Sequence, residues 1–355
     1  AVAVLAIAFA VFAAVPAVAE DSDATGTTYY VGGTDASDEN AGTSADVPFA
    51  TLVKAVETIS DDTGVIELQG DVTGAGIFLA AGNANITIDL NGHTYTCNGP
   101  AVGSDGYETQ AFHLEKGNTV TIKDGTVTTA AVDTSGVEML IQNYCDLTLT
   151  NVNVDGSKLA SGEYAVSINN GTVLMDGTTS ITASTGGVAF DCFWWPNNGY
   201  TDGAQITVDT TGKISGKIEV ADSTKATGES KNTLNVKNGT FTEAIEFTSF
   251  NGSEVTIAEG VALDVNIPSE KTVTGSVTFG TNGVTFANIT AGTGGITFSE
   301  GSVEISGNIV SGSGTAAEIE AVGSSDVVFK NLTITSGTLD VSNVKIEGKV
   351  IVSED

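Results

Sequence analysis

Short stretches of alternating polar and apolar residues recur along most of the chain, and each ends at Gly, Asn or Asp. Residues 119–127, 146–154 and 233–241 share one template, in which two polar-apolar pairs precede a turn and another apolar residue. A period of two is typical of a strand with one buried face. The same template fits five more segments, namely 205–208, 254–257, 276–279, 302–305 and 326–334. The copies lie roughly 20 to 30 residues apart, a period typical of solenoids.

We therefore expect an all-β protein, a right-handed parallel β-helix over residues 64–355. In such a fold the apolar residues of each strand point into a narrow core, and equivalent positions stack along the axis. A sandwich of hairpins is the rival architecture, which would favour two-residue turns between paired strands. The template predicts that these residues point inward: Val120, Leu147, Leu234, Val255 and Val277.

Residues 20–63 differ from the repeats and predict an N-terminal cap. Apolar residues between 48 and 59 have helical spacing. They are Phe49, Leu52, Val53, Val56 and Ile59. Pro48 suits the first turn of such a helix. A short helix here would cover the open apolar end of the solenoid.

Residues 1–19 carry no charge, are almost wholly apolar and end in Ala17-Val18-Ala19. This pattern indicates an export segment, either the remnant of a signal peptide or a retained assembly helix. A membrane anchor is a further alternative, although 19 residues only just span a bilayer. The chain is thus expected to be exported, and it would contact a membrane only through residues 1–19 if they are retained.

The charge of the chain excludes one class of partner. The 13 basic residues are all Lys, and against 44 acidic residues they leave a formal net charge of −31. Without Arg the chain lacks the bidentate contacts that read bases and bind phosphates, so nucleic acid is a poor partner. Anionic membrane surfaces are disfavoured for the same reason.

The N-terminal region carries a resemblance to a known superfamily. The residues that carry it are Tyr30-Val31, Asp35, Asp38, Gly42-Thr43-Ser44, Pro48-Phe49-Ala50-Thr51-Leu52 and Ala55. They resemble the N-terminal motif of secreted right-handed β-helix proteins of the pectate-lyase-like superfamily. Residues 86–94 are similar to a coil that recurs in large surface proteins of anaerobic gut bacteria and archaea. The resemblance implies fold and export, to the cell surface or medium of a bacterium or archaeon, but it implies no activity.

Enzymatic chemistry receives little support from the sequence. Lyases on this fold hold a uronate with Arg or Ca²⁺ and abstract a proton with Lys or Arg, whereas Lys side chains among so many carboxylates stay protonated. Glycoside hydrolysis needs two carboxylates, which stacked coils could supply from Asp89, Asp124 or Asp155. Neither His93 nor His113 lies in the Gly-His-Gly signature of β-helix hydrolases.

We expect a non-enzymatic surface element that is structural, adhesive or filament-forming, with no catalytic residue assigned. Its partners would be other copies of itself or cell-surface and polysaccharide partners. The alternative is a carbohydrate-active enzyme, a polysaccharide lyase or glycoside hydrolase, or a polysaccharide-binding module.

Two sets of residues are candidate binding sites. The repeat is interrupted at 191–200, where Trp194, Trp195 and Tyr200 would either stack on sugar rings or fold back over the core. Asp35 and Asp38 could bind Ca²⁺ through oxygen, and no other cofactor is expected.

Three cysteines, Cys97, Cys145 and Cys192, lie 48 and 47 residues apart. We expect them to be buried free thiols that stack on one face of the core.

Overall fold

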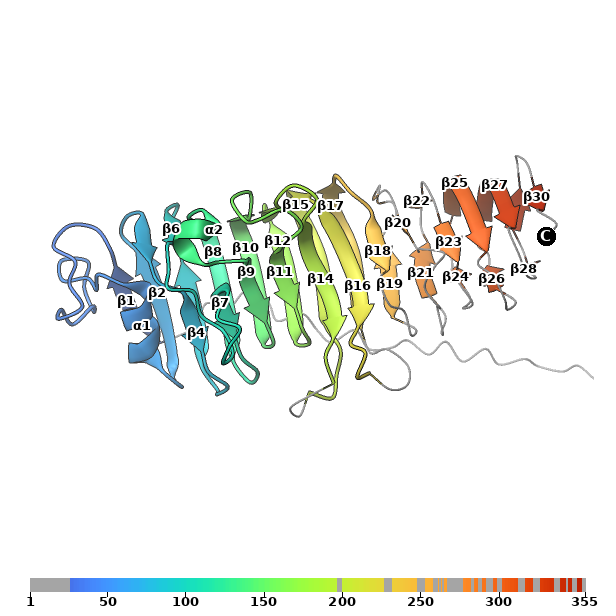
Figure 1. Ribbon diagram of the computed structural model, residues 1–355. Coiled ribbons are helices and arrows are strands. Elements are labelled where there is room, and N and C mark those ends of the chain that lie inside the picture. The colour runs from blue at the N-terminus through green and yellow to red at the C-terminus, as the bar shows by residue number, and fades with distance from the viewer. Residues whose placement is uncertain are drawn as a thin grey trace, which may run out of the picture.

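The computed structural model describes residues 26–196, 200–226 and 232–246 with their side chains, and beyond them mainly the backbone of further strands. The described strands stack side by side into an elongated solenoid, from β1 and α1 at one end to β30 near the other (Figure 1). Every pairing between the named strands in this part of the chain is parallel, as between β8 and β10.

Three parallel sheets form the walls of the solenoid. Sheet A has sixteen strands, β1 (Thr27–Val31), β2 (Thr63–Leu68), β3 (Val72–Gly74), β5 (Asn85–Asp89), β6 (Thr94–Cys97), β8 (Thr119–Thr129), β10 (Asp146–Asp155), β12 (Thr172–Gly177), β13 (Ser180–Thr182), β15 (Gln205–Ser215), β17 (Thr233–Phe241), β19 (Glu254–Ile257), β21 (Val277–Thr281), β24 (Ile296–Phe298), β26 (Ala317–Ala321) and β28 (Leu339–Ser342). Sheet B has eight, β4 (Ile77–Leu79), β7 (Gln110–Leu114), β9 (Met139–Asn143), β11 (Tyr164–Ile168), β14 (Val188–Trp194), β16 (Lys217–Asp222), β18 (Ile245–Phe247) and β20 (Val265–Asn266). Sheet C has six, β22 (Val284–Phe286), β23 (Ile289–Ala291), β25 (Ser302–Ser311), β27 (Asp326–Ile334), β29 (Val344–Ile346) and β30 (Val350–Val352).

The chain alternates between sheets, so each strand pairs with the strand one coil further on. In sheet A, β8 pairs with β10, and β10 pairs with β12. In sheet B, β9 pairs with β11, and β11 pairs with β14. Parallel partners separated by a whole coil exclude a hairpin sandwich. The predicted all-β parallel β-helix is confirmed.

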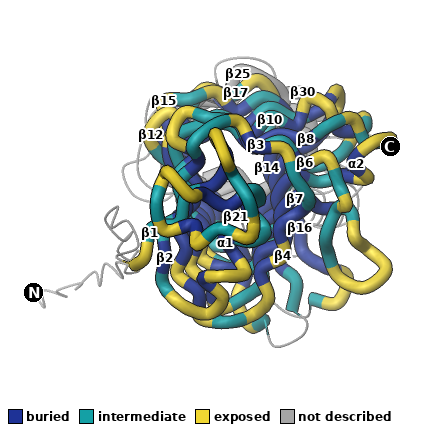
Figure 2. The backbone as a smooth tube through the Cα atoms, turned by 90° about the vertical axis from the view of Figure 1, so that its left-hand side faces the viewer, coloured by how far each residue is buried: buried dark blue, intermediate teal, exposed yellow. Residues whose placement is uncertain are grey.

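Stacked apolar side chains fill the interior. The register places Val120 opposite Leu147 and Leu234 opposite Val255, and all four are buried. Sheet B contributes its own inward row from the other wall, in which Phe190 is fully buried. A view along the axis shows that the buried stretches of backbone belong to the strands of the wall, while many of the loops are exposed (Figure 2). The inward orientation predicted from the template is thus confirmed for these four residues, while the side chain of Val277 lies outside the described residues.

The predicted helix is present but begins later than expected. Helix α1 spans Leu52–Ile59, and the Thr51 side chain caps it by accepting a hydrogen bond from the Lys54 N–H at 3.1 Å. Pro48 precedes the helix instead of occupying its first turn, because Phe49 is drawn into a parallel bridge with Val31. The helix buries its apolar side against the first coil, and Figure 2 shows it lying across the end of the solenoid.

A second, four-residue helix, α2 (Val132–Ser135), lies between β8 and β9 and was not predicted. Among the described residues, no helix has the length and apolar character needed to span a membrane. Residues 1–19 lie outside the described residues, and the division into a cap at 20–63 and a solenoid from 64 stays a prediction.

Polar side chains join successive coils where sheet A turns. Asp124 and Asn151 both adopt positive φ angles, 56° and 52°, which Asn and Asp tolerate better than most residues. The Asn151 amide donates to Asp124 Oδ1 at 3.0 Å, and its oxygen accepts from the Thr178 N–H at 3.0 Å. One side chain therefore ties three coils together and satisfies a backbone donor at the turn.

Two buried asparagines repeat one arrangement before sheet A strands. Asn118 Oδ1 accepts from the Ala84 N–H at 3.0 Å, and Asn232 Oδ1 accepts from the Ala204 N–H at 2.9 Å. Each amide also donates to backbone carbonyls, for instance from Asn118 to Ala80 at 2.8 Å. At these corners, backbone N–H and C=O groups that do not pair with a neighbouring strand form hydrogen bonds with the asparagine side chains.

The stacked core predicts that one buried charge destabilises the solenoid. Leu234→Asp should lower the free energy of unfolding by about 3–5 kcal/mol, because the carboxylate would enter a dry core between two coils. Lys237→Asp, an exposed position on the same strand, should change it by less than about 1 kcal/mol. Denaturant unfolding followed by circular dichroism measures both, and equal effects of the two substitutions would contradict the inward placement of Leu234.

Candidate functional site

The outward-facing residues of sheet B, which we call the sheet B face, form rows along the solenoid axis. Register places Phe78 opposite His113, His113 opposite Gln142, and Asp191 opposite Glu219. Ser167 continues this row between Gln142 and Asp191. A second row comprises Glu115, Tyr144, Asn169, Phe193 and Ala221. Neighbouring coils thus present side chains about 4.8 Å apart, the spacing between paired strands.

The first cavity of the sheet B face, the carboxylate cavity, has a volume of about 280 Å³. Its lining residues are Tyr164, Asn169, Asp191, Phe193, Glu219, Ala221 and Asp222. The Tyr164 hydroxyl donates a hydrogen bond to Glu219 Oε2, which fixes both side chains across two coils. Three acids and two aromatic rings therefore share one small cavity.

Asp191 is a carboxyl of this cavity with a strongly raised pKa. The Ile168 N–H donates to Asp191 Oδ1, and the Ser167 hydroxyl donates to Asp191 Oδ2 at 3.0 Å. Burial raises the pKa of the Asp191 carboxyl to about 7. The two hydrogen bonds lower the pKa and so oppose this rise, whereas the negative charge of Glu219 adds to it. Asp191 therefore exchanges its proton near neutral pH.

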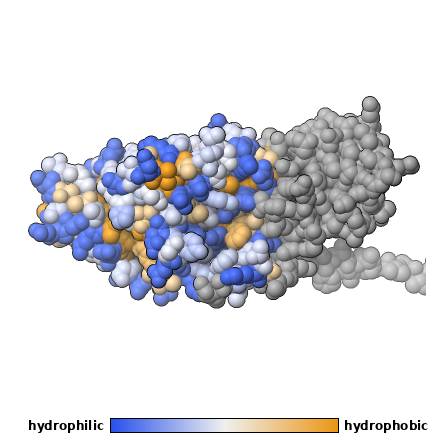
Figure 3. All heavy atoms as spheres, viewed as in Figure 1, coloured by the Kyte–Doolittle hydropathy of each residue, from blue (hydrophilic) through white to orange (hydrophobic). Residues whose placement is uncertain are grey.

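The second cavity, the tyrosine cavity, has a volume of about 530 Å³. Its lining residues are Tyr144, Asp146, Asn170, Gly171, Thr172, Tyr200, Thr201, Asp202, Gly203 and Gln205. The Asn169 amide, in the wall of the carboxylate cavity, donates to the Tyr144 hydroxyl at 3.3 Å. Asp146, Thr172 and Gln205 begin strands of sheet A, so the tyrosine cavity lies at the edge of the sheet B face, where the chain passes into sheet A. Since Asn169 and Asn170 are consecutive, the two cavities are neighbours. Apolar patches lie among hydrophilic side chains on the side shown in Figure 3.

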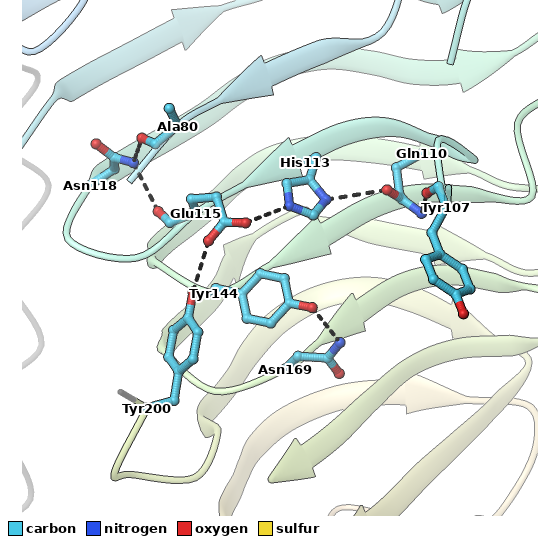
Figure 4. A network of polar contacts seen from close by, with 9 residues as sticks. All are labelled: Ala80, Tyr107, Gln110, His113, Glu115, Asn118, Tyr144, Asn169 and Tyr200. Atoms are coloured by element: carbon cyan, nitrogen blue, oxygen red, sulfur yellow. Dashed lines mark hydrogen bonds and ion pairs between the residues drawn. The ribbon is translucent and has the colours of Figure 1, made fainter. Parts of the chain in front are cut away.

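A polar relay holds the tyrosine cavity in place (Figure 4). The buried imidazole of His113 contacts Gln110 Oε1 at 3.2 Å and Glu115 Oε1 at 2.8 Å, and the Tyr200 hydroxyl donates to Glu115 Oε2 at 3.0 Å. The hydrogen bond from His113 is the main reason that the pKa of Glu115 is lowered, so this carboxyl stays ionised. Tyr200 is thereby tied to β7, far from it in sequence.

Aromatic rings line the relay. The Tyr144 and Tyr200 ring centroids lie 5.2 Å apart, and those of Phe78 and His113 lie 5.1 Å apart with nearly parallel planes. The Lys116 ammonium sits 4.8 Å from the centroid of Tyr200, a cation–π contact. Because His113 is fully buried, it positions Glu115 and does not itself reach a ligand.

The three predicted binding residues lie in three different environments. Trp194 is buried and belongs to the wall of the solenoid, the covering role weighed above. Trp195 is half-buried, stacks on Phe193 with centroids 6.4 Å apart, and is held by paired hydrogen bonds between its backbone and the Asn170 amide. Tyr200 lines the tyrosine cavity. A ligand at these three residues stays a prediction.

Asp35 and Asp38 belong to the loop before α1. The Asp38 carboxylate accepts hydrogen bonds from the Ala50 and Thr51 N–H groups and from the Thr51 hydroxyl, all at 2.9 Å. Asp35 is exposed at a positive φ of 57°. In the part of the chain that the structure describes, no group of three or more His, Cys, Asp or Glu side chains could hold a metal ion. Calcium binding at this loop stays a prediction.

Other residues considered from the sequence lie apart from the cavities. Asp89 contacts the Lys123 ammonium at 3.5 Å on sheet A, and Asp155 accepts from the Ser157 N–H. His93 lies 3.8 Å from Asp71. The three cysteines are buried and free, as predicted. They do not share one face, because Cys97 lies in sheet A and Cys192 in sheet B.

Sequence reasoning missed Asp191, Glu219, Tyr144 and Tyr164. A signal for the first was present, since Asp191 interrupts an otherwise apolar strand from Val188 to Trp194. A charge inside such a strand requires a special environment. The other three gain their importance only from the register between coils.

No protein-family model matches this chain, and neither a curated protein nor a solved structure shows significant similarity to it.

The raised pKa of Asp191 predicts a pH dependence of stability. The unfolded chain releases this proton near pH 3.8 and the folded chain near pH 7, so the folded state holds more protons in between. Stability therefore falls as pH rises from about 4 to 7, by up to about 4 kcal/mol from this group. Asp191→Asn should remove this contribution, so its stability relative to wild type should rise with pH.

The control is Asp209→Asn, which removes one carboxylate from an exposed position of sheet A. Denaturation midpoints of the three proteins at pH 4, 5.5, 7 and 8 provide the comparison. Parallel curves for wild type and Asp191→Asn would show that Asp191 ionises normally.

Proposed function

We propose that this chain is an exported, non-enzymatic β-solenoid that adheres to polysaccharide through the sheet B face. The observation that carries the proposal is the pair of neighbouring cavities, whose walls combine aromatic rings with acids and amides. Flat apolar rings stack on the carbon-bound faces of sugars, and amides and carboxylates bind hydroxyl groups.

The rows favour an extended polymer over a small ligand. Each coil repeats the row at about the inter-strand spacing of 4.8 Å, close to the length of one sugar in an extended chain. A polysaccharide that runs along the axis would therefore meet one set of side chains per sugar. Several weak contacts of this kind add up to useful avidity.

Export and the relation to the pectate-lyase-like superfamily are part of this proposal. They are supported by the apolar residues 1–19 and by the N-terminal motif from Tyr30 to Ala55. The stacked coils form a stiff support that would present the sheet B face away from a cell. Association with other copies of the chain is compatible with this role.

Substitution of rings on the sheet B face should weaken binding. Tyr144→Ala and Phe193→Ala remove one ring from each cavity, and each should weaken polysaccharide binding about threefold to tenfold. Tyr30→Ala removes a half-buried ring from β1 in sheet A and should leave binding unchanged. Affinity electrophoresis and titration calorimetry with a panel of soluble polysaccharides provide the test. Binding by none of the panel, or equal loss in all three variants, would refute the proposal.

A glycoside hydrolase is the second candidate, favoured by one observation. Asp191, with a pKa near 7, shares the carboxylate cavity with Glu219 on the next coil. A carboxyl that keeps its proton beside a second carboxylate is the arrangement that acid-assisted glycoside cleavage needs. Release of reducing ends that disappears in both Asp191→Asn and Glu219→Gln would favour this candidate over adhesion.

A further inference from the structure

The walls of the two cavities carry charge of one sign. Among the described residues that line them, five are acidic and none is basic. The acids are Asp146 and Asp202 in the tyrosine cavity, and Asp191, Glu219 and Asp222 in the carboxylate cavity. A ligand that enters either cavity therefore meets carboxylates beside aromatic rings.

The lysines nearest the sheet B face are already engaged, and their contacts show what these rings accept. The Lys116 ammonium lies 4.8 Å from the centroid of Tyr200, and the Lys225 ammonium lies 4.9 Å from the centroid of Trp195. Lys217 pairs with Glu246 at 3.2 Å. Two ammonium groups thus rest on aromatic rings at this face, and a ligand ammonium would meet the same combination of ring and carboxylate.

We propose, on the basis of the function proposed above, that the two cavities select a glycan whose sugars carry free amino groups and reject uronate polymers. An ammonium group in a partly buried cavity gains from the nearby carboxylates, whereas a uronate carboxylate is repelled by them and finds no Arg to bind it. In the carboxylate cavity the Glu219 carboxylate supplies this charge, because the neighbouring Asp191, with a pKa near 7, stays protonated at mildly acidic pH.

The net charge of −31 attracts any polycation at long range. The experiment must therefore distinguish binding in the cavities from attraction by the overall charge of the protein. The probes are three soluble oligosaccharides of equal length: a glucosamine oligomer, its fully N-acetylated form and a galacturonate oligomer. Affinities are measured by calorimetry at mildly acidic pH, where the amines are protonated, and at two salt concentrations.

Three variants each remove one negative charge. Glu219→Gln keeps an acceptor for the Tyr164 hydroxyl in the carboxylate cavity, Asp146→Asn alters the tyrosine cavity, and Asp209→Asn alters the exposed side of sheet A. The wild-type protein should bind the glucosamine oligomer at least about tenfold more tightly than its N-acetylated form, with the galacturonate oligomer weakest. Glu219→Gln and Asp146→Asn should each reduce that preference about threefold to tenfold, and Asp209→Asn should not.

The outcomes distinguish this inference from the proposed function. If the N-acetylated or galacturonate oligomer binds as tightly as the glucosamine oligomer, the amino-sugar preference is wrong while glycan adhesion stands. If all three variants reduce the preference equally, bulk charge and not the cavities causes it, and the inference is again wrong. If neither the three oligomers nor any polysaccharide of greater length binds, both proposals are wrong.

Discussion

Parallel pairing between successive coils is the interaction on which the whole molecule depends. Each strand hydrogen-bonds to the strand one coil before and one coil after it, as β10 does with β8 and β12. This pairing repeats the same inward position along the axis, so that Leu147 packs between Val120 and Val173. A single coil could not bury these side chains, and core and backbone ladder therefore stabilise each other. Asparagines such as Asn151 satisfy the backbone where the ladder is interrupted.

The same pairing also builds the outer face. Because side chains alternate along a strand, a register that aligns the core must also align the residues between core positions. Ile218 and Val220 point inward, and Glu219 between them points outward next to Asp191. The rows of polar and aromatic groups on the sheet B face thus arise from the requirement to stack the core. The core fixes the positions of the outward residues, and only the types of these side chains can vary to suit a ligand.

The sequence allowed the fold to be predicted because apolar core residues alternate with polar residues along described strands of sheet A such as β10 and β15. It did not allow the site to be predicted, because coils differ in length. Val120 lies 34 residues after Ile86, whereas Val255 lies only 21 residues after Leu234. Without the loop conformations, the residue opposite Asp191 on the next coil cannot be derived. Helix α2 was missed because a four-residue turn contains no apolar period.

The tryptophans illustrate what alternation alone could have shown. Trp194 and Trp195 are neighbours in sequence, and the strand that ends at Trp194 sends successive side chains to opposite sides. The Trp194 ring therefore belongs to the wall, and the Trp195 ring lies at the surface. The alternation along the strand predicts this difference between the two neighbours. The Asn170 amide, which holds the Trp195 backbone, could not be found without the coil register.

The buried thiols link the fold of the protein to its chemical durability. Burial raises the pKa of Cys97, Cys145 and Cys192, so little reactive thiolate forms while the coils stay closed. In an oxidising medium the thiols are protected from oxidation only while the packing around each sulfur stays intact. Once coils separate, three thiols become reactive together, and at least one of the three is left without a partner within the same chain. Oxidation would then join unfolded molecules to one another, so that the rate of opening, more than the equilibrium stability, sets the working lifetime of the protein.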